Sequence, residues 1–453
     1  MTRGATGFAG QSGEISQIRQ ISQIRQMGWI RLGGIIFKLM ISRGIATFTL
    51  DYGKCPRWLW ERMLKLGREM VYIIVDEYGP EELVRRVADP VWFQSLGTVL
   101  AFDWNASGLT TILTAVLKES IRGREEDLGL YIAGGKGKTS RRTPDEIIDL
   151  SERANISDIS AKSLVYNSKM AAKVDSSLVQ DGYQLYHHTM FFAYDRSMPH
   201  FARTSPLGRT QVTSQNGHLR STQEKSVVWS VVQQGMNTEN TTARRYHWYS
   251  DNIENLVIEP HSGIASQAQS STLNLTNKKS KRVQDNSIGF IKEGYNSVMK
   301  DINILRRHSS TLSKMISARK GETQLTLLDL YDQDFNTHPV VNEDFGKSKY
   351  LEKVLYQVCE QKPKNYESLL SQKGIGPKTM RALSLVSEVI YGAAPSYEDP
   401  ARYSFAHGGK DAIPYPVDRK TYDQTIEFFK KVINKTRLGF NEKQKLVSKL
   451  EAK

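Results

Sequence analysis

Cysteine is scarce in this chain, which has two, Cys55 and Cys359, among 453 residues. A disulfide framework and a cysteine zinc site are both excluded, because each needs several cysteines at defined spacing. So few thiols are typical of a reducing compartment. The composition therefore predicts a cytoplasmic protein.

A long apolar run is also missing. The most apolar stretch, 29–41, is too short to cross a bilayer and contains Arg31 and Lys38. We interpret it as a helix or as part of an extension at the start of the chain, and we expect no membrane partner. Residues 1–42, in which ISQIRQ occurs twice in tandem, form this N-terminal extension.

Acidic residues are outnumbered, with 48 Asp and Glu against 62 Lys and Arg, so the formal net charge is +14. A basic balance favours a polyanionic partner, and we expect nucleic acid, with DNA ahead of RNA. The hydrophobic content of 39% is that of a globular protein, and the length suits two or three domains.

The phosphate-binding loop of nucleotide hydrolases lacks its first glycine here. The stretch IAGGKGKTSRRTP, residues 132–144, contains the last three residues of the Walker pattern at 137–139. Ile132, however, occupies the position of the first glycine. A β-branched residue resists the positive φ that this turn requires. What remains is a glycine-rich loop whose four cations we predict to contact phosphates: Lys136, Lys138, Arg141 and Arg142. Thr143 as N-cap and Pro144 as the first helical residue predict a helix directly after it.

Periodicity predicts an α+β protein. The expected parts are the extension at 1–42, a mainly helical domain with the glycine–lysine loop at 43–180, a small antiparallel β segment at 181–276 with an insertion at 196–225, a long basic helix at 277–320, and a helical domain at 321–453. Apolar residues at four-three spacing after Pro56 predict the first helix, and aromatic and β-branched residues at 183–194 and 226–235 predict paired strands.

Apolar residues at heptad spacing mark the stretch 288–316. This pattern predicts one long helix with a narrow apolar seam. Such a seam suits a protein partner or self-association.

The most specific motif is LLSQKGIGPKTMRALSLVSEVIYG, residues 369–392. A helix end, then Gly374-Ile375-Gly376, then a helix that begins at Pro377, is the helix-hairpin-helix pattern. We predict that Ile375 fills the turn and that backbone N–H groups, with Lys373 and Lys378, hold a phosphate. The alternative is a helical turn that only packs.

The same motif resembles that of helix-hairpin-helix DNA glycosylases, in which a lysine after the hairpin attacks the sugar and an aspartate assists it. Lys378 stands at the place of the lysine, and Asp418 is the candidate aspartate, although the interval between them is much longer than in that superfamily. A nucleophilic lysine would also have to be neutral.

A second candidate site lies in the predicted strands, where we expect a catalytic set of His188, Gln234, His247 and Arg245. On adjoining strands, His188 and Gln234 would point into one cleft, an imidazole would act as general acid or base in phosphodiester cleavage, and an arginine would hold a phosphate. The same residues could instead bind a divalent metal of unknown identity. The alternative is an aromatic-rich sheet packed with hydrogen-bonded core histidines.

Six stretches are shared with one family: GIATFTLDYGKCPRWLWERM, DPVWFQSLGTVLAFDWNASG, GGKGKTSRRTPDEI, YHHTMFF, VVQQGMN and ARRYHW. Over residues 43–430 the chain resembles the archaeal and thermophile-associated domain-of-unknown-function family numbered 763. It departs from that family in the N-terminal extension and the 196–225 insertion.

The resemblance implies a C-terminal helix-hairpin-helix and a DNA-associated role, such as repair. We therefore expect a DNA-processing protein, as a nuclease ahead of a glycosylase or abasic lyase. A non-catalytic adaptor and an RNA-binding protein stay open as alternatives.

Overall fold

The computed structural model describes residues 29–32, 35–38, 55–100, 106–194, 227–239, 241–266, 271–305, 348–401 and 419–451. Its α-helices are α2 (Arg57–Tyr78), α3 (Pro80–Val87), α4 (Pro90–Val99), α5 (Ala106–Ile121), α6 (Glu125–Leu128), α7 (Lys138–Arg141), α8 (Thr143–Arg153), α9 (Asp158–Ser177), α10 (Lys281–Glu293), α12 (Lys349–Gln361), α13 (Tyr366–Ser371), α14 (Pro377–Val389), α15 (Arg419–Lys435) and α16 (Phe440–Glu451). Its strands are β1 (Trp29–Leu32), β2 (Ile35–Lys38), β3 (Leu130–Lys136), β4 (Val179–Gln180), β5 (Gln184–Tyr194), β6 (Val227–Asn237), β7 (Thr242–Tyr249), β8 (His261–Ser266) and β9 (Leu273–Asn274). The protein is therefore α+β, as predicted.

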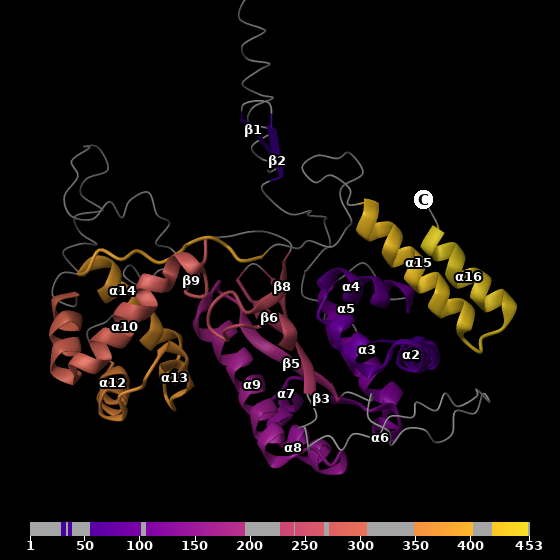
Figure 1. The fold of residues 1–453 in the computed structure, drawn as a ribbon, viewed down its shortest axis with the longest axis horizontal. Helices are drawn as coiled ribbons and strands as arrows, with labels where there is room; N and C mark the ends of the chain where they lie inside the picture. Colours follow the sequence, from indigo (N-terminus) through magenta and orange to yellow (C-terminus); the bar gives the residue numbers. More distant parts are fainter. Residues whose placement is uncertain are drawn as a thin grey trace, which may run out of the picture.

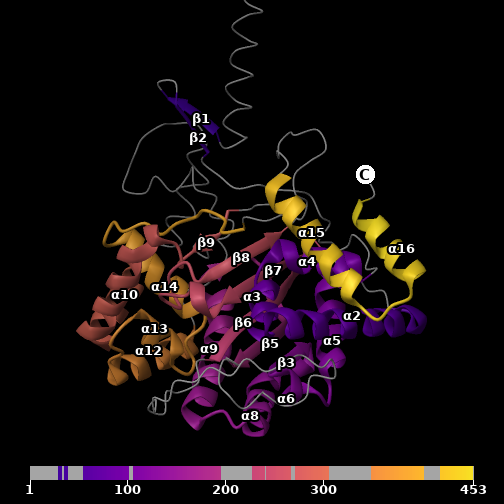
Figure 2. The same cartoon turned by 45° about the vertical axis from the view of Figure 1, so that its right-hand side comes forward.

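A five-stranded antiparallel sheet forms the centre, in the order β3-β5-β6-β7-β8 (Figures 1 and 2). The predicted pairing of the two aromatic-rich stretches is confirmed, since they form β5 and β6. The edge strand β3 comes from the segment expected to be a separate helical domain. The expected boundary near residue 180 therefore does not separate two independent cores.

Helices cover both faces of this sheet, because apolar side chains point to both sides of each strand. One face, which carries Ile132, Phe191 and Val232, packs on α2 to α5 and on α15. We call it the α5 face. The opposite face, with Phe192 and Val231, packs on α8 to α10 and on α12 to α14, and we call it the α9 face. Figures 1 and 2 show the sheet between these two helical layers.

The first helix begins where the sequence pattern predicts. Pro56 precedes α2, whose buried stripe includes Met63, Met70 and Ile74. The next helices open with prolines, and the Asp89 side chain caps α4 by accepting hydrogen bonds from two backbone N–H groups. Such a cap contributes about 1 kcal/mol.

The helix expected over 288–316, within the basic segment 277–320, is not continuous. Helix α10 ends at Glu293, and Gly294 follows with φ 103° and ψ 168°, outside helical geometry. A second helical stretch covers 295–305. The heptad pattern continues through the break because both pieces face one core, where Ile291 and Val298 are buried. The prediction of a single long helix was therefore wrong, and residues 306–347 lie outside the described residues.

Two further local predictions were wrong. The stretch that begins at Trp29, interpreted as a helix or as part of an extension, contains the antiparallel strands β1 and β2, so the helical interpretation was wrong. Thr143 is the first residue of α8 and not its cap, and its hydroxyl donates to the carbonyl oxygen of Ser140 at the end of the unexpected short helix α7. Within the part of the chain that the structure describes, no helix has the length and apolar character needed to span a membrane. The 196–225 insertion and Asp418 lie outside that part.

Candidate functional site

The predicted catalytic residues do not share one cleft. In the register of β5 and β6, His187 lies opposite Gln234 and His188 opposite Gln233, after an irregularity between Leu185 and His187. Directly opposed residues of an antiparallel pair point to the same face, and neighbours along a strand to opposite faces. His188 therefore lies on the α9 face, whereas Gln234 lies on the α5 face.

Three of the four predicted residues do meet on the α5 face, where they tie the sheet to the helices. Gln234 donates to the backbone oxygen of Ser107 at 3.0 Å, and His247 Nδ1 donates to the carbonyl oxygen of Val87 at 2.9 Å. The Arg245 guanidinium donates to the Thr110 hydroxyl at 3.0 Å. All three side chains have 0% exposure. They are interior hydrogen-bonding groups between the sheet and the helical layer.

His188 belongs to a second buried network on the α9 face. Its Nε2 atom lies 2.8 Å from the Ser168 hydroxyl, and its Nδ1 atom lies 2.8 Å from Oε1 of Gln233. The amide nitrogen of Gln233 donates to Asp175 at 2.5 Å, and Asp175 also accepts from Trp248 and His261. Ser168 has only 2% of its surface exposed. The order hydroxyl, imidazole, amide and carboxylate resembles a nucleophile relay, but all four side chains are buried.

The ionisation of the buried groups agrees with an interior role. Burial lowers the pKa of His187 to about 3 and also lowers the pKa of His188. Burial, reinforced by neighbouring Arg245, lowers the pKa of His247 well below its ordinary value. Neutral buried imidazoles serve as hydrogen-bonding core residues. Among the described residues no group of three or more His, Cys, Asp or Glu side chains could hold a metal ion. The geometry thus favours the alternative of a sheet packed with core histidines.

The turn between α13 and α14 has the geometry that the sequence predicts. Gly374 has φ +91°, and Ile375 is buried, with 3% exposure, so that it fills the turn. Gly376 is the N-cap of α14 and provides no side-chain cap. A Cβ atom on Gly376 would meet nothing within 4 Å. The first turn of α14 is therefore open to a ligand.

Exposed groups surround this turn. Lys373 and Lys378 are both exposed, on either side of the two glycines. The Tyr350 side chain, 64% exposed, has its hydroxyl 3.5 Å from the carbonyl oxygen of Gly374. Sequence reasoning missed this tyrosine, because only packing brings α12 beside the turn.

The turn is held on α9 and β4. The Lys173 ammonium donates to the carbonyl oxygens of Leu370 and Gln372 at the end of α13. The Gln180 amide donates to the carbonyl oxygen of Pro377 at 3.0 Å. The Arg381 guanidinium donates to the same Gln180 side chain, so this cation is engaged within the protein. These bonds make the turn a rigid part of the α9-face layer.

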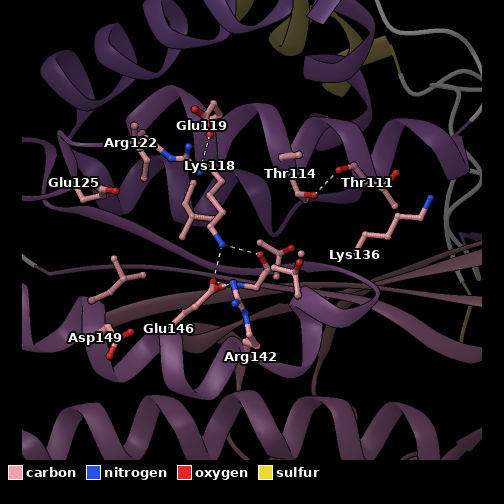
Figure 3. A pocket seen from close by; sticks show the side chains of 18 of the residues that line it. Thr111, Thr114, Lys118, Glu119, Arg122, Glu125, Lys136, Arg142, Glu146 and Asp149 are labelled. Atoms are coloured by element: carbon pink, nitrogen blue, oxygen red, sulfur yellow. Dashed lines mark hydrogen bonds and ion pairs between the residues drawn. The ribbon is translucent and has the colours of Figure 1, made fainter. Parts of the chain in front are cut away.

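The glycine–lysine loop borders a pocket of about 810 Å³ between α5, the end of β3 and α8 (Figure 3). Lys136 and Arg142 line this pocket, whereas Lys138 and Arg141 are exposed outside its lining. At its centre the Lys118 ammonium donates to the Gly134 carbonyl and to the Glu146 carboxylate, at 2.9 and 2.6 Å. The structure thus divides the four predicted phosphate-contacting cations into two pairs.

Gly134 is required by this arrangement. It has φ +95°, and a Cβ atom there would lie 2.3 Å from the backbone oxygen of His188. Its N–H donates to the Glu146 carboxylate at 2.8 Å. The glycines that suggested a phosphate loop therefore serve first to close β3 against α8.

Several polar residues of these networks were not predicted. Asp175 lies on the buried stripe of α9, together with Leu164 and Ala171. A carboxylate in an otherwise apolar stripe was the sequence signal for it. Lys118 and Glu146 carry no such signal, since both are common residues of half-exposed helix faces.

Comparison with known families finds a match. The family model described as a protein of unknown function (DUF763) matches residues 44–198 and 219–417. The gap at 199–218 falls within the insertion expected from the sequence. No curated protein and no solved structure matches the chain.

Proposed function

The chain belongs to the DUF763 family, and we propose that it binds the phosphate backbone of nucleic acid, DNA in the first place, through the turn between α13 and α14. The observation that carries this proposal is the uncapped start of α14, where Gly376 leaves open space between two exposed lysines. Free N–H groups at a helix start and nearby ammonium groups favour a phosphate. Contacts of this kind do not read base sequence.

Lys138 and Arg141 form a second proposed contact with the backbone. Both side chains are exposed on the short helix α7. They would strengthen binding to any polyanion through their charge alone and would not form a specific binding site. Lys136 and Arg142 are left out of this contact because they line the pocket.

Cleavage by the His188, Gln234, Arg245 and His247 set is not part of the proposal. These side chains lie on two opposite faces of a packed sheet and are buried. Glycosylase chemistry at Lys378 is not part of the proposal either, since its candidate partner Asp418 lies outside the described residues. The proposed role is binding within DNA processing or repair.

The test measures the affinity of a short fluorescent duplex by anisotropy for Gly376→Ala, Lys378→Gln and the control Lys364→Gln. Lys364 is an exposed lysine that precedes α13. We expect the first two variants to bind several-fold more weakly and the control to bind like the wild type. If Lys378→Gln and Lys364→Gln lose the same duplex affinity, the loss comes from the lower net charge and not from a contact at the turn. Parallel titrations with duplex RNA show whether the protein prefers DNA to RNA. Borohydride trapping on abasic DNA tests lyase chemistry and should give no covalent adduct.

A further inference from the structure

The pocket beside the glycine–lysine loop has two ends of different chemistry, separated by the Lys118–Glu146 ion pair (Figure 3). Lys136, Thr111 and Thr114 lie at one end, and Glu125 and Asp149 lie at the other, together with Arg122, which is paired with Glu119. The pair joins α5 to α8 at 2.6 Å. A ligand that fills the pocket would therefore meet a cationic end and an acidic end at once.

The Lys136 end is suited to a phosphate. Among the described residues no carboxylate lies within ion-pair distance of Lys136, whereas Lys118 and Arg122 in the same pocket are paired with Glu146 and Glu119. The Lys136 ammonium lies 5.8 Å from the ring centroid of Tyr186, within cation–π distance. An ammonium without a carboxylate partner beside hydroxyl groups is a favourable environment for a phosphate.

The pocket wall at the Lys136 end is formed by hydrogen-bonded side chains. Thr114 and Thr189 line the pocket, and their hydroxyls lie within hydrogen-bond distance of Nε2 of the buried His187, at 3.2 and 3.0 Å. The other ring nitrogen, Nδ1, has no partner among the described residues. The lowered pKa of His187 keeps the ring neutral, so it adds polarity behind the hydroxyls without adding charge.

The opposite end and the walls suit a larger organic group. Carboxylates such as Glu125 and Asp149 accept hydrogen bonds from ligand hydroxyls and donate none. Trp60, Ile121 and Leu150 add aromatic and aliphatic surface to the lining. A volume of about 810 Å³ is in the range of cofactor pockets. Inorganic phosphate would leave most of this space and both carboxylates unused.

We propose that this pocket binds a nucleoside phosphate, with its phosphate at Lys136 and its ribose hydroxyls toward Asp149. Such a ligand combines the three parts that the pocket complements: an anion, vicinal hydroxyls and a flat ring. Gly134 and Gly135 are paired in β3, so the phosphate would be held by side chains and not wrapped by a Walker-type loop. The inference is independent of the backbone-binding turn.

The test is calorimetric titration of the full chain with ADP, for the wild type, Lys136→Gln and the control Lys138→Gln. The control lies two residues away, is exposed and does not line the pocket. We expect saturable binding that weakens about tenfold in Lys136→Gln, the loss of one charged hydrogen bond, and changes less than about twofold in the control. Asp149→Asn should weaken ADP more than inorganic pyrophosphate, because only ADP has ribose hydroxyls.

Three outcomes would overturn the inference. They are no saturable ADP binding by the wild type, equal loss in Lys136→Gln and Lys138→Gln, and equal affinity for ADP and inorganic pyrophosphate. Duplex binding by Lys136→Gln, measured in parallel, separates the two proposals. If this variant loses duplex affinity while ADP does not bind, the pocket is part of the nucleic-acid surface. Unchanged duplex affinity with weakened ADP binding supports a separate site.

Discussion

The side-chain amide of Gln233 joins His188 to Asp175 across the α9 face, with its oxygen 2.8 Å from the imidazole and its nitrogen 2.5 Å from the carboxylate. Because the amide nitrogen must donate to Asp175, the amide oxygen accepts from Nδ1 of His188. Nε2 of the neutral ring then accepts the hydroxyl proton of Ser168. One buried amide thus fixes the tautomer of the histidine.

Gln233→Leu should therefore destabilise the protein. The change removes two buried hydrogen bonds and leaves donors and acceptors of His188 and Asp175 unsatisfied, at a cost of about 2–4 kcal/mol. Urea unfolding followed by circular dichroism measures this loss. Gln184→Leu, at an exposed position of β5, is the matched control and should change the free energy of unfolding little. Equal stability of the two variants would show that the network contributes nothing to folding.

Acid should weaken the fold over a defined pH range. The pKa values of His187, His188 and His247 are lowered by burial, that of His187 to about 3. In the unfolded chain these rings take up protons from about pH 6.5 downward. Stability should therefore be constant with respect to these groups above that pH and fall below it, by up to about 1.4 kcal/mol per pH unit for each histidine. His187→Gln should reduce the slope in urea titrations between pH 6 and 4, whereas an unchanged slope would contradict a buried neutral His187.

The two glycines of the α13–α14 turn should respond differently to alanine. Gly374 has φ +91°, and its added Cβ would lie 3.0 Å from a Val354 methyl group, so Gly374→Ala should lose at least about 1 kcal/mol of stability. Gly376 has the extended φ of −156° and open space, so Gly376→Ala should keep its melting temperature. Thermal unfolding of both variants checks this. A melting temperature lowered equally in both would mean that Gly376 is needed for folding. A loss of DNA binding in Gly376→Ala would then not report on a phosphate contact.

Duplex binding should fall steeply with salt. Each neutralised phosphate contributes about −0.9 to the log–log slope, so four to six contacts should give roughly −4 to −5. Lys378→Gln removes about one phosphate contact and should therefore reduce the magnitude of this slope by about 0.9. Anisotropy titrations over a series of salt concentrations measure it. A flat dependence, or tight binding to a single sequence, would contradict contact through the backbone.

Much of the local structure could be read before any coordinates. Pro56, Pro80 and Pro90 each mark a helix start, because proline is accepted in the first turn and has no N–H to leave unpaired. The Gly374 to Gly376 turn was predictable for the same kind of reason, since positive φ at Gly374 and a buried Ile375 are local requirements. Heptad spacing failed at Gly294, because the pattern reports which side faces the core and not whether the chain stays helical.

The arrangement of the candidate site residues could not be predicted from the sequence. That β5 and β6 pair was determined by their aromatic and β-branched residues, but the register was not, because shifting it by one residue moves every side chain to the other face. The irregularity near His187 therefore decided that His188 and Gln234 lie on opposite faces and that both are buried. The pocket likewise depends on α5 and α8 meeting over the end of β3, and Lys118 and Glu146 are 28 positions apart in the chain. Local chemistry determined the turns, the helix starts and the basic charge of this protein. Long-range packing alone decided which polar residues face a ligand, because burial depends on what the rest of the chain places over them.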